Sequence, residues 1–182
     1  MLVVGDSLSA EYGLSRGRGW VGLLQNRLAE RTSPMQVVNA SISGDTTSGG
    51  RSRLPALLTK HKPSVVIIEL GGNDALRGLP LSMTRDNLQA MTTASKQAGA
   101  KVLLLGMQVP PNYGPDYNRQ FADAFASVAK QNNAGIVPFM LAGVADHPNA
   151  SALFQADRIH PNEKAHPTIL ETVWPEVRKL IP

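Results

Sequence analysis

Hydrophobic positions along the chain fall into five short segments separated by longer amphipathic ones. The runs at 64–70 and 101–106 are almost continuously aliphatic, without alternation of polar and apolar residues. Strands buried on both faces have this pattern, which favours a parallel sheet covered by helices. Successive segments begin roughly 28–37 residues apart, as βα units do. The expected strands are Leu2–Val4, Gln36–Asn39, Ser64–Leu70, Lys101–Gly106 and Gly135–Val137.

The segments between these strands place apolar residues on one face of a helix. Three such stripes stand out: Trp20, Leu23, Leu24 and Leu28; Phe121, Phe125, Val128 and Ala129; and Leu170, Val173, Trp174, Val177 with Leu180 or Ile181. Pro175 falls inside the last stripe and predicts a kink or a break there. Strands alternating with helices indicate an α/β fold.

Composition narrows the class of protein. The chain has 182 residues, of which 42% are hydrophobic and 18% charged, so we expect one folded domain over 1–182 and no disordered protein. No apolar run approaches the ~20 residues of a membrane-spanning helix. The net charge of +4 comes from scattered residues, which argues against nucleic-acid binding. Without cysteine, disulfides, thiolate metal sites and a cysteine nucleophile are excluded.

The start of the chain carries no visible signal peptide, because Met1 runs directly into an apolar strand. We expect a cytoplasmic protein, or a periplasmic or secreted one if a leader was removed before Met1. Nothing in the sequence calls for stable membrane insertion or for a partner chain, so a monomer is the default expectation.

Candidate chemistry begins where the first strand ends, in Gly5-Asp6-Ser7. A serine reached through a glycine at the end of a buried strand can present its hydroxyl above the sheet edge. Nearby peptide N–H groups then point the same way, which suits a nucleophile with an oxyanion donor. Gly-Asp-Ser is also common turn chemistry, and that alternative reading is the more frequent one for the tripeptide alone.

A second element lies near the C-terminus, where Asp157 precedes His160 by three residues and Pro161 follows. In a turn, the carboxylate can hold one imidazole nitrogen and leave the other free as a base. Pro161 disfavours helix at His160 and suits a helix that starts just after it. A solvated loop histidine with a nearby acid is the alternative.

Two further loops after strands carry glycine and polar residues, 41–46 and 71–74. Gly44 allows a close approach of backbone to substrate, and the Asn73 side chain can donate to a developing oxyanion. The alternative is that Asp45 or Asp74 caps the following helix. All these loops follow parallel strands, so they meet at the sheet edge where open α/β sheets bind ligands.

Two other signals do not support a site. Residues 17–22 match G-x-G-x-x-G, but they do not directly follow a strand, and Asn39 stands where a dinucleotide fold needs an acid. The histidines have no metal-ligand spacing. We expect neither a metal nor a cofactor. Glu69 and Asp6 are interpreted as a structural acid and a loop-ordering residue.

The four blocks together resemble the SGNH (GDSL-type) hydrolase family. They are Gly5-Asp6-Ser7-Leu8, the block around Gly44, Gly71-Gly72-Asn73-Asp74, and Asp157-x-x-His160-Pro161. The segments 38–46, 69–78 and 111–114 are similar to the bacterial lysophospholipase, acyl-CoA thioesterase I and arylesterase group. The resemblance covers nearly the whole chain and implies a three-layer, flavodoxin-like α/β/α sandwich with five parallel strands.

The resemblance also implies roles. Ser7 would be the nucleophile, His160 the general base and Asp157 its orienting acid, with Ser7, Gly44 and Asn73 forming the oxyanion hole. Substrate-binding positions would be Gly72, Ala75, Leu76, Tyr113 and Ile159. Ala75 and Arg158 depart from expected glycines and Gln108 from a common basic residue, which affects substrate preference and loop mobility.

The sequence therefore favours a serine esterase or thioesterase that acts on small acyl esters through an acyl-enzyme. Candidate substrates are aryl and alkyl esters, acyl-CoA and lysophospholipids. A carbohydrate O-deacetylase of the same fold is the main alternative, and the apolar residues of 76–81 argue for an acyl groove instead. A non-catalytic binding module is a third reading, which has no need of this combination of residues.

Overall fold

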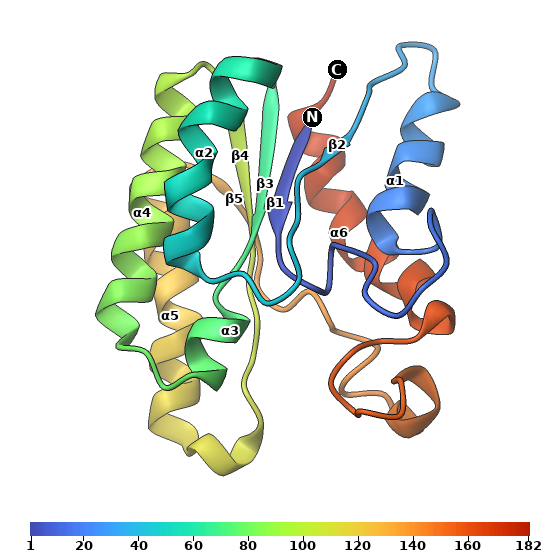
Figure 1. Cartoon of the computed structure of the whole chain (residues 1–182), viewed down its shortest axis with the longest axis vertical. Helices are drawn as coiled ribbons and strands as arrows, with labels where there is room; N and C mark the ends of the chain where they lie inside the picture. The colour runs from blue at the N-terminus through green and yellow to red at the C-terminus, as the bar shows by residue number, and fades with distance from the viewer.

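A computed structural model describes all residues of the chain, 1–182, and consists of a five-stranded parallel sheet between two layers of helices (Figure 1). The strand order is β2-β1-β3-β4-β5. The strands are β1 (Leu2–Gly5), β2 (Val38–Asn39), β3 (Val65–Glu69), β4 (Lys101–Leu105) and β5 (Gly135–Val137). The expected α/β/α sandwich is thereby confirmed, and each predicted strand is present. Relative to the predicted bounds, β1 is one residue longer, β5 is identical, and β2, β3 and β4 are shorter.

Six α-helices connect and follow the strands. They are α1 (Trp20–Ala29), α2 (Thr47–His61), α3 (Gly72–Leu76), α4 (Leu81–Gln97), α5 (Pro115–Gln131) and α6 (His166–Leu180), with short 3₁₀ turns at Pro111–Tyr113, Ala150–Leu153 and Glu163–Ala165. The three predicted helical stripes lie on α1, α5 and α6. The kink or break expected at Pro175 is not a break, since α6 is one continuous helix across it.

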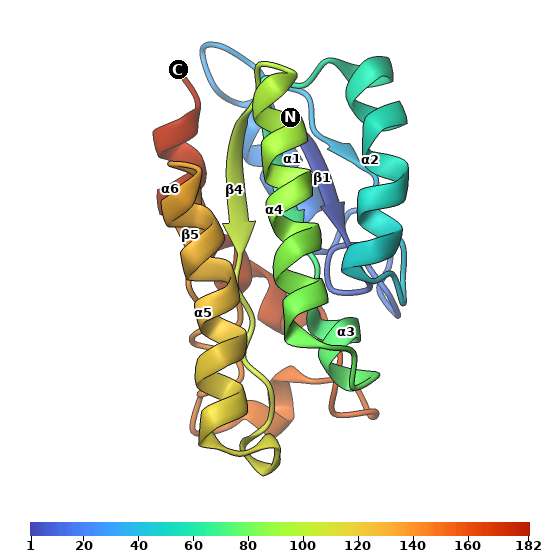
Figure 2. The ribbon, with the colours of Figure 1, turned by 90° about the vertical axis from the view of Figure 1, so that its left-hand side faces the viewer.

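The two faces of the sheet divide the core by strict alternation along each strand. In β3, Val65 and Ile67 pack with α1 and α6, whereas Val66 and Ile68 pack with α2, α4 and α5. Figures 1 and 2 show these two helical layers on opposite sides of the strands. Burial on both faces explains why this strand reads as an unbroken aliphatic run. None of the helices is long and apolar enough to span a membrane.

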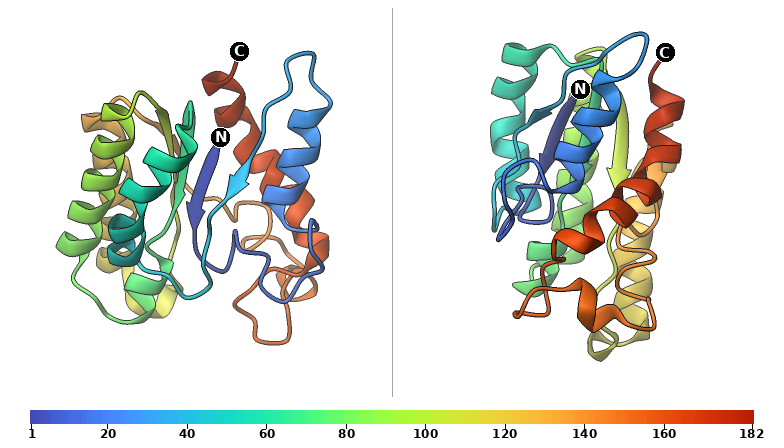
Figure 3. Two further views of the ribbon diagram at one scale, coloured as in Figure 1. Left: turned by 45° about the horizontal axis from the view of Figure 1, so that its top comes forward. Right: turned by 90° about the vertical axis from the view of Figure 1, so that its right-hand side faces the viewer.

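The carboxyl ends of the strands define the edge that carries the candidate chemistry. Both termini of the chain lie at the opposite end of the sheet, while the loops after β1, β2 and β3 and the loop before α6 gather below it (Figures 1 and 3). From β1 the chain moves to β2 on one side, and from β3 to β4 on the other. Ligands bind at such a switch point in open α/β sheets.

Candidate active site

Ser7, His160 and Asp157 form a continuous chain of hydrogen bonds at this edge. The Ser7 Oγ lies 2.9 Å from His160 Nε2, and His160 Nδ1 lies 2.6 Å from Asp157 Oδ2. With the carboxylate accepting from Nδ1–H, Nε2 is the nitrogen free to accept the serine proton. Residues 153 positions apart therefore meet in the order nucleophile, base and acid.

The turn from 155 to 160 holds the imidazole in place. Asp157 Oδ1 accepts the backbone N–H groups of Ile159 (2.9 Å) and His160 (3.0 Å), and His160 O accepts from Gln155 N (2.8 Å). The hydrogen bond from the His160 side chain, followed by these two backbone bonds, lowers the pKa of Asp157 to about 2. Asp157 is therefore a carboxylate throughout the pH range in which histidine titrates.

Ser7 sits in a turn that begins directly after β1. Asp6 O accepts from Ala10 N (2.9 Å), and Asp6 Oδ1 accepts from Leu8 N (3.0 Å). Asp6, which precedes Ser7, therefore fixes the residues that follow it. The Ser7 N–H has no acceptor within the protein. It is therefore available to a substrate oxygen.

Gly44 offers a second free backbone donor. Its N–H has no protein acceptor, while its carbonyl accepts from Arg77 Nη2 at 2.7 Å. The φ angle of Gly44 is 79°, a left-handed conformation that costs any residue with a Cβ roughly 1 kcal/mol or more. Glycine is thus the residue that lets the 41–46 loop make this turn without strain.

The third predicted donor, Asn73, is already occupied. Its Nδ2 donates to Asp6 Oδ2 and to Asp45 O, each at 2.9 Å, and these two bonds use both amide hydrogens. The bonds tie the loops after β1, β2 and β3 together around Ser7. To reach a substrate oxygen, the Asn73 amide must share or release one of them.

A pair of buried acids lies beneath the nucleophile. Asp6 and Glu69 are both buried, and Glu69 Oε2 accepts from Ser9 Oγ (2.6 Å) and Asp6 N (3.2 Å). Trp20 Nε1 in turn donates to Ser9 Oγ. Burial raises the pKa of Asp6 to about 6, and burial together with the nearby Asp6 raises that of Glu69. The structure thus places both residues as the hydrogen-bonded, structural groups that the sequence suggested.

The expected helix caps are arranged differently. Thr46, rather than Asp45, is the N-cap of α2, and its side chain accepts from Gly49 N. Asp74 does not cap its own helix, α3. It accepts from the backbone N–H of Thr47 at 2.9 Å and so caps the start of α2. This buried bond fixes the loop of Gly44 against the loop of Asn73.

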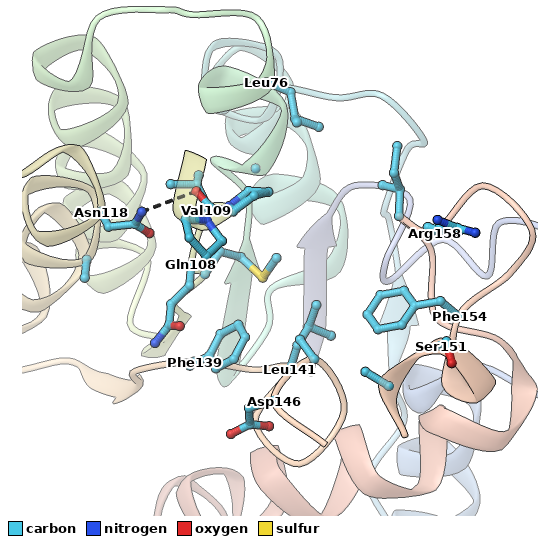
Figure 4. Close-up of a pocket in the computed structure, with 18 of the residues that line it drawn as sticks. Leu76, Gln108, Val109, Asn118, Phe139, Leu141, Asp146, Ser151, Phe154 and Arg158 are labelled. Carbon is cyan, nitrogen blue, oxygen red and sulfur yellow. Dashed lines mark hydrogen bonds between the residues drawn. The ribbon is translucent and has the colours of Figure 1, made fainter. Parts of the chain in front are cut away.

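An open groove of about 1500 Å³ begins beside the triad and runs between the loop after β4 and the segment 139–159 (Figure 4). Of the predicted substrate-binding positions, Gly72, Leu76 and Ile159 line it, as does Arg158. The wall is mainly apolar, with Leu76, Met107, Val109, Phe139, Leu141 and Phe154 among its residues.

Two predicted substrate-binding residues, Ala75 and Tyr113, do not line this groove. Ala75 is 2% exposed and packs in the core under α3, because α3 turns its Leu76 side outward. Tyr113 packs against Tyr117, with ring centroids 5.5 Å apart, on the flank of α5. Sequence spacing places both residues in the right loops but does not show which way their side chains point.

Tyr12 is a residue near the site that sequence reasoning missed. Its ring centroid lies 4.5 Å from that of His160, and half of the residue is exposed. Its backbone N–H bonds to Ser7 O (3.4 Å), so the turn after the nucleophile carries the ring to the base. An exposed aromatic residue five positions after the serine was the available signal.

Comparison with known proteins agrees with this geometry. The model of the GDSL-like Lipase/Acylhydrolase family matches residues 3–167. The chain is 51% identical to "Esterase TesA" of Pseudomonas aeruginosa, covering 100% of this chain and 89% of the relative. It is 40% identical to "Thioesterase 1/protease 1/lysophospholipase L1" of Escherichia coli, covering 100% and 84%.

A solved structure is similar over the same length. The psychrotrophic esterase EstA from Pseudoalteromonas sp., in a structure inhibited by monoethylphosphonate, superposes with a TM-score of 0.90 at 41% identity and covers 98% of this chain and 96% of that one. The family model and the identity of full-length relatives lead to the same conclusion. This chain belongs to the GDSL-like lipase/acylhydrolase family.

Proposed function

We propose that this chain is a serine esterase and thioesterase that hydrolyses small acyl esters, including aryl esters, acyl-CoA and lysophospholipids, with Ser7 as nucleophile. The observation that carries the proposal is the Ser7–His160–Asp157 hydrogen-bond chain at the mouth of an apolar groove. The names of the relatives, which include an esterase and a thioesterase/lysophospholipase, support the substrate class.

Acylation follows from the geometry of the three side chains. As the Ser7 oxygen attacks the carbonyl carbon, its proton moves to His160 Nε2, 2.9 Å away. The resulting imidazolium is stabilised by the Asp157 carboxylate, which does not itself take the proton. The oxyanion accepts hydrogen bonds from the free N–H groups of Ser7 and Gly44. The Asn73 amide adds a third once one of its present hydrogen bonds is released.

Collapse of the tetrahedral intermediate breaks the bond to the leaving group. The proton on His160 passes to the leaving oxygen or sulfur, and the acyl group remains on Ser7 as an ester. Water then attacks the acyl carbon as it loses a proton to His160, which forms a second oxyanion intermediate. When this intermediate collapses, the bond from the acyl carbon to Ser7 Oγ breaks, His160 returns the proton to Ser7, and the carboxylic acid leaves. The steps use the substrate, water and the residues named above.

The apolar part of the groove supports an acyl substrate. It can bury a hydrocarbon chain, and each methylene buried contributes about 0.8 kcal/mol. Leu76 and Ile159 line the groove, and Ile159 adjoins His160 in the chain, so both stand close to the acyl group of a bound ester.

Hydrolysis of a p-nitrophenyl ester series from acetate to palmitate tests the proposal, with wild type compared to Ser7→Ala. We expect turnover that depends on Ser7, a loss of at least about 10⁴-fold in kcat for the variant, and an optimum at a chain long enough to enter the groove. Circular dichroism of both proteins checks that the variant is folded.

Two outcomes would contradict the proposal. If Ser7→Ala keeps most of its activity, Ser7 is not the nucleophile. If folded wild type turns over no ester, the deacetylase or binding-module readings take precedence, and release of acetate from acetylated sugars separates those two.

A further inference from the structure

The exposed large hydrophobic side chains of this protein all lie near the active site. There are four of them, each from a different segment at the carboxyl edge of the sheet, and everywhere else such side chains are buried or half-buried. They are Tyr12, Ile42, Leu76 and Ile159, with exposed fractions of 50%, 52%, 54% and 54%. We call these four residues the apolar rim.

Contacts tie the apolar rim to the site. Tyr12 lies against the His160 ring, and Ile159 is the next residue back from His160 in the chain. Ile42 bonds through its backbone to Gly5 O (3.0 Å), just before Asp6 and Ser7. Leu76 and Ile159 line the same groove. The rim therefore surrounds Ser7 from several sides rather than forming one hydrophobic wall.

Two arginines without salt-bridge partners stand in the same ring. Arg77 follows Leu76 and reaches the Gly44 carbonyl, and Arg158 precedes Ile159 and lines the groove (Figure 4). The φ angle of Arg158 is 58°, where a residue other than glycine is strained. A strained residue at an active-site turn points to a use for its side chain.

The acidic groups near the mouth are hydrogen-bonded within the protein, and one of them is paired with an arginine. Asp157 accepts from the His160 side chain and keeps its negative charge, whereas Asp45 pairs with Arg53 at 2.8 Å. Asp146 accepts from a backbone N–H and also lines the groove, apart from Arg158 (Figure 4). The rim thus combines exposed apolar side chains with unpaired positive charge.

We propose that the apolar rim, with Arg77 and Arg158, docks this enzyme onto an anionic lipid surface. This combination is what peripheral proteins use at membranes, where apolar side chains enter the interface and arginines meet anionic headgroups. The occupant is a lipid surface rather than a protein, because two rim residues line the open groove and the others lie beside the active site, so a protein seated on the rim would close the entrance. A lipid surface instead supplies acyl esters to the groove. The use of such docking rests on the proposed function, whereas the docking itself can be tested without catalysis.

Vesicle sedimentation tests the docking separately from catalysis. The Ser7→Ala protein is mixed with phosphatidylcholine vesicles with or without phosphatidylglycerol, so that no lipid is hydrolysed during the measurement. We expect it to sediment with anionic vesicles, to bind pure phosphatidylcholine far more weakly, and to lose most binding in about 1 M salt, where the Debye length is about 3 Å.

Charge and apolar contributions are then separated by substitution. Arg77→Gln with Arg158→Gln should reduce partition onto anionic vesicles by roughly 30-fold, from the contribution of two arginines at a lipid surface. Ile42→Ser should weaken binding to both kinds of vesicle. The matched control is Lys60→Gln with Arg178→Gln, which removes the same charge from exposed positions near the C-terminal ends of α2 and α6.

The result that overturns the proposal is equally direct. If the Ser7→Ala protein does not sediment with anionic vesicles, or if the control pair loses as much binding as the rim pair, no docking face exists there. Ultracentrifugation without lipid completes the test: a dimer that Ile42→Ser dissociates would assign the rim to a second copy of this chain. Wild-type turnover of p-nitrophenyl acetate is measured alongside, so failed docking is not mistaken for an inactive enzyme.

Discussion

Two aspartates serve this site from opposite environments. Asp157 lies in an exposed turn, receives three hydrogen bonds from His160 and Ile159, and has a pKa lowered to about 2. Asp6 lies buried beside Glu69, and its pKa is raised to about 6, mainly by loss of water. The first is held as a permanent charge next to the base. The charged form of Asp6 is disfavoured by burial, and its carboxylate holds the Asn73 amide.

The contrast shows that environment rather than residue type assigns the role. Asp157 faces a group that becomes cationic during the reaction, so its charge contributes in the transition state. Asp6 bonds to neutral donors, Leu8 N and Asn73 Nδ2, which are present in the resting protein as well. We therefore expect Asp157 to matter most for rate and Asp6 to matter for alignment and for the pH dependence of stability.

Replacement of Asp157 should give the largest effect. In Asp157→Asn the carboxylate that fixes the imidazole tautomer and stabilises the imidazolium is gone, so kcat should fall by about 10³–10⁴ with little change in KM. The measurement is steady-state hydrolysis of a soluble aryl ester. A loss below tenfold would remove the distinction between the two aspartates.

Asn73→Ala tests the role of Asp6, whose carboxylate accepts a hydrogen bond from the Asn73 amide. If Asn73 turns one N–H to the oxyanion, kcat should fall by about 10²–10³ while KM is nearly unchanged. The amide is bonded to Asp6 and Asp45 O in the resting protein, so this effect requires a redirected bond. If the variant retains more than a tenth of the wild-type rate, Asn73 holds the loops together but does not donate to the oxyanion.

Much of the fold was predictable because burial leaves a clear pattern. The runs that became β3 and β4 are aliphatic on both faces, since helices cover both sides of the sheet. The short β2 was harder to bound, because it lies at the sheet edge with only two paired residues. Of the kink or break predicted at Pro175, the break is absent, because α6 is fixed by its packing against the sheet on both sides of the proline.

The site was predictable as a set of residues but not as a set of contacts. Motif spacing placed Ser7, Asp157 and His160 in loops at one edge, yet their distances depend on how the whole sheet brings those loops together. Side-chain direction was out of reach: Ala75 points into the core and Tyr113 toward Tyr117. The double bonding of Asn73 could not be read from sequence either, because it joins three separate loops.

The smallest expected effect concerns the stability of Asp6→Asn as a function of pH. The pKa of Asp6 is raised in the folded state, so unfolding releases a proton between its ordinary value of 3.8 and about 6. Wild type therefore loses stability as the pH rises through that window, by up to about 3 kcal/mol from this group. Asparagine has no proton to release. The difference in unfolding free energy between variant and wild type, measured by urea titration, should shift in favour of the variant from pH 4 to pH 7.

Asp157→Asn is the matched control for this measurement, because its pKa is displaced in the opposite direction. A carboxyl group with a lowered pKa stabilises the fold above its ordinary value and loses that contribution as the pH falls toward about 2. Its stability curve should therefore run parallel to that of wild type from pH 4 to pH 7 and depart only in more acidic solution. Parallel curves for Asp6→Asn in the same window would show that the buried carboxyl group keeps its ordinary pKa. The contrast between the two aspartates would then lie in their hydrogen bonds alone.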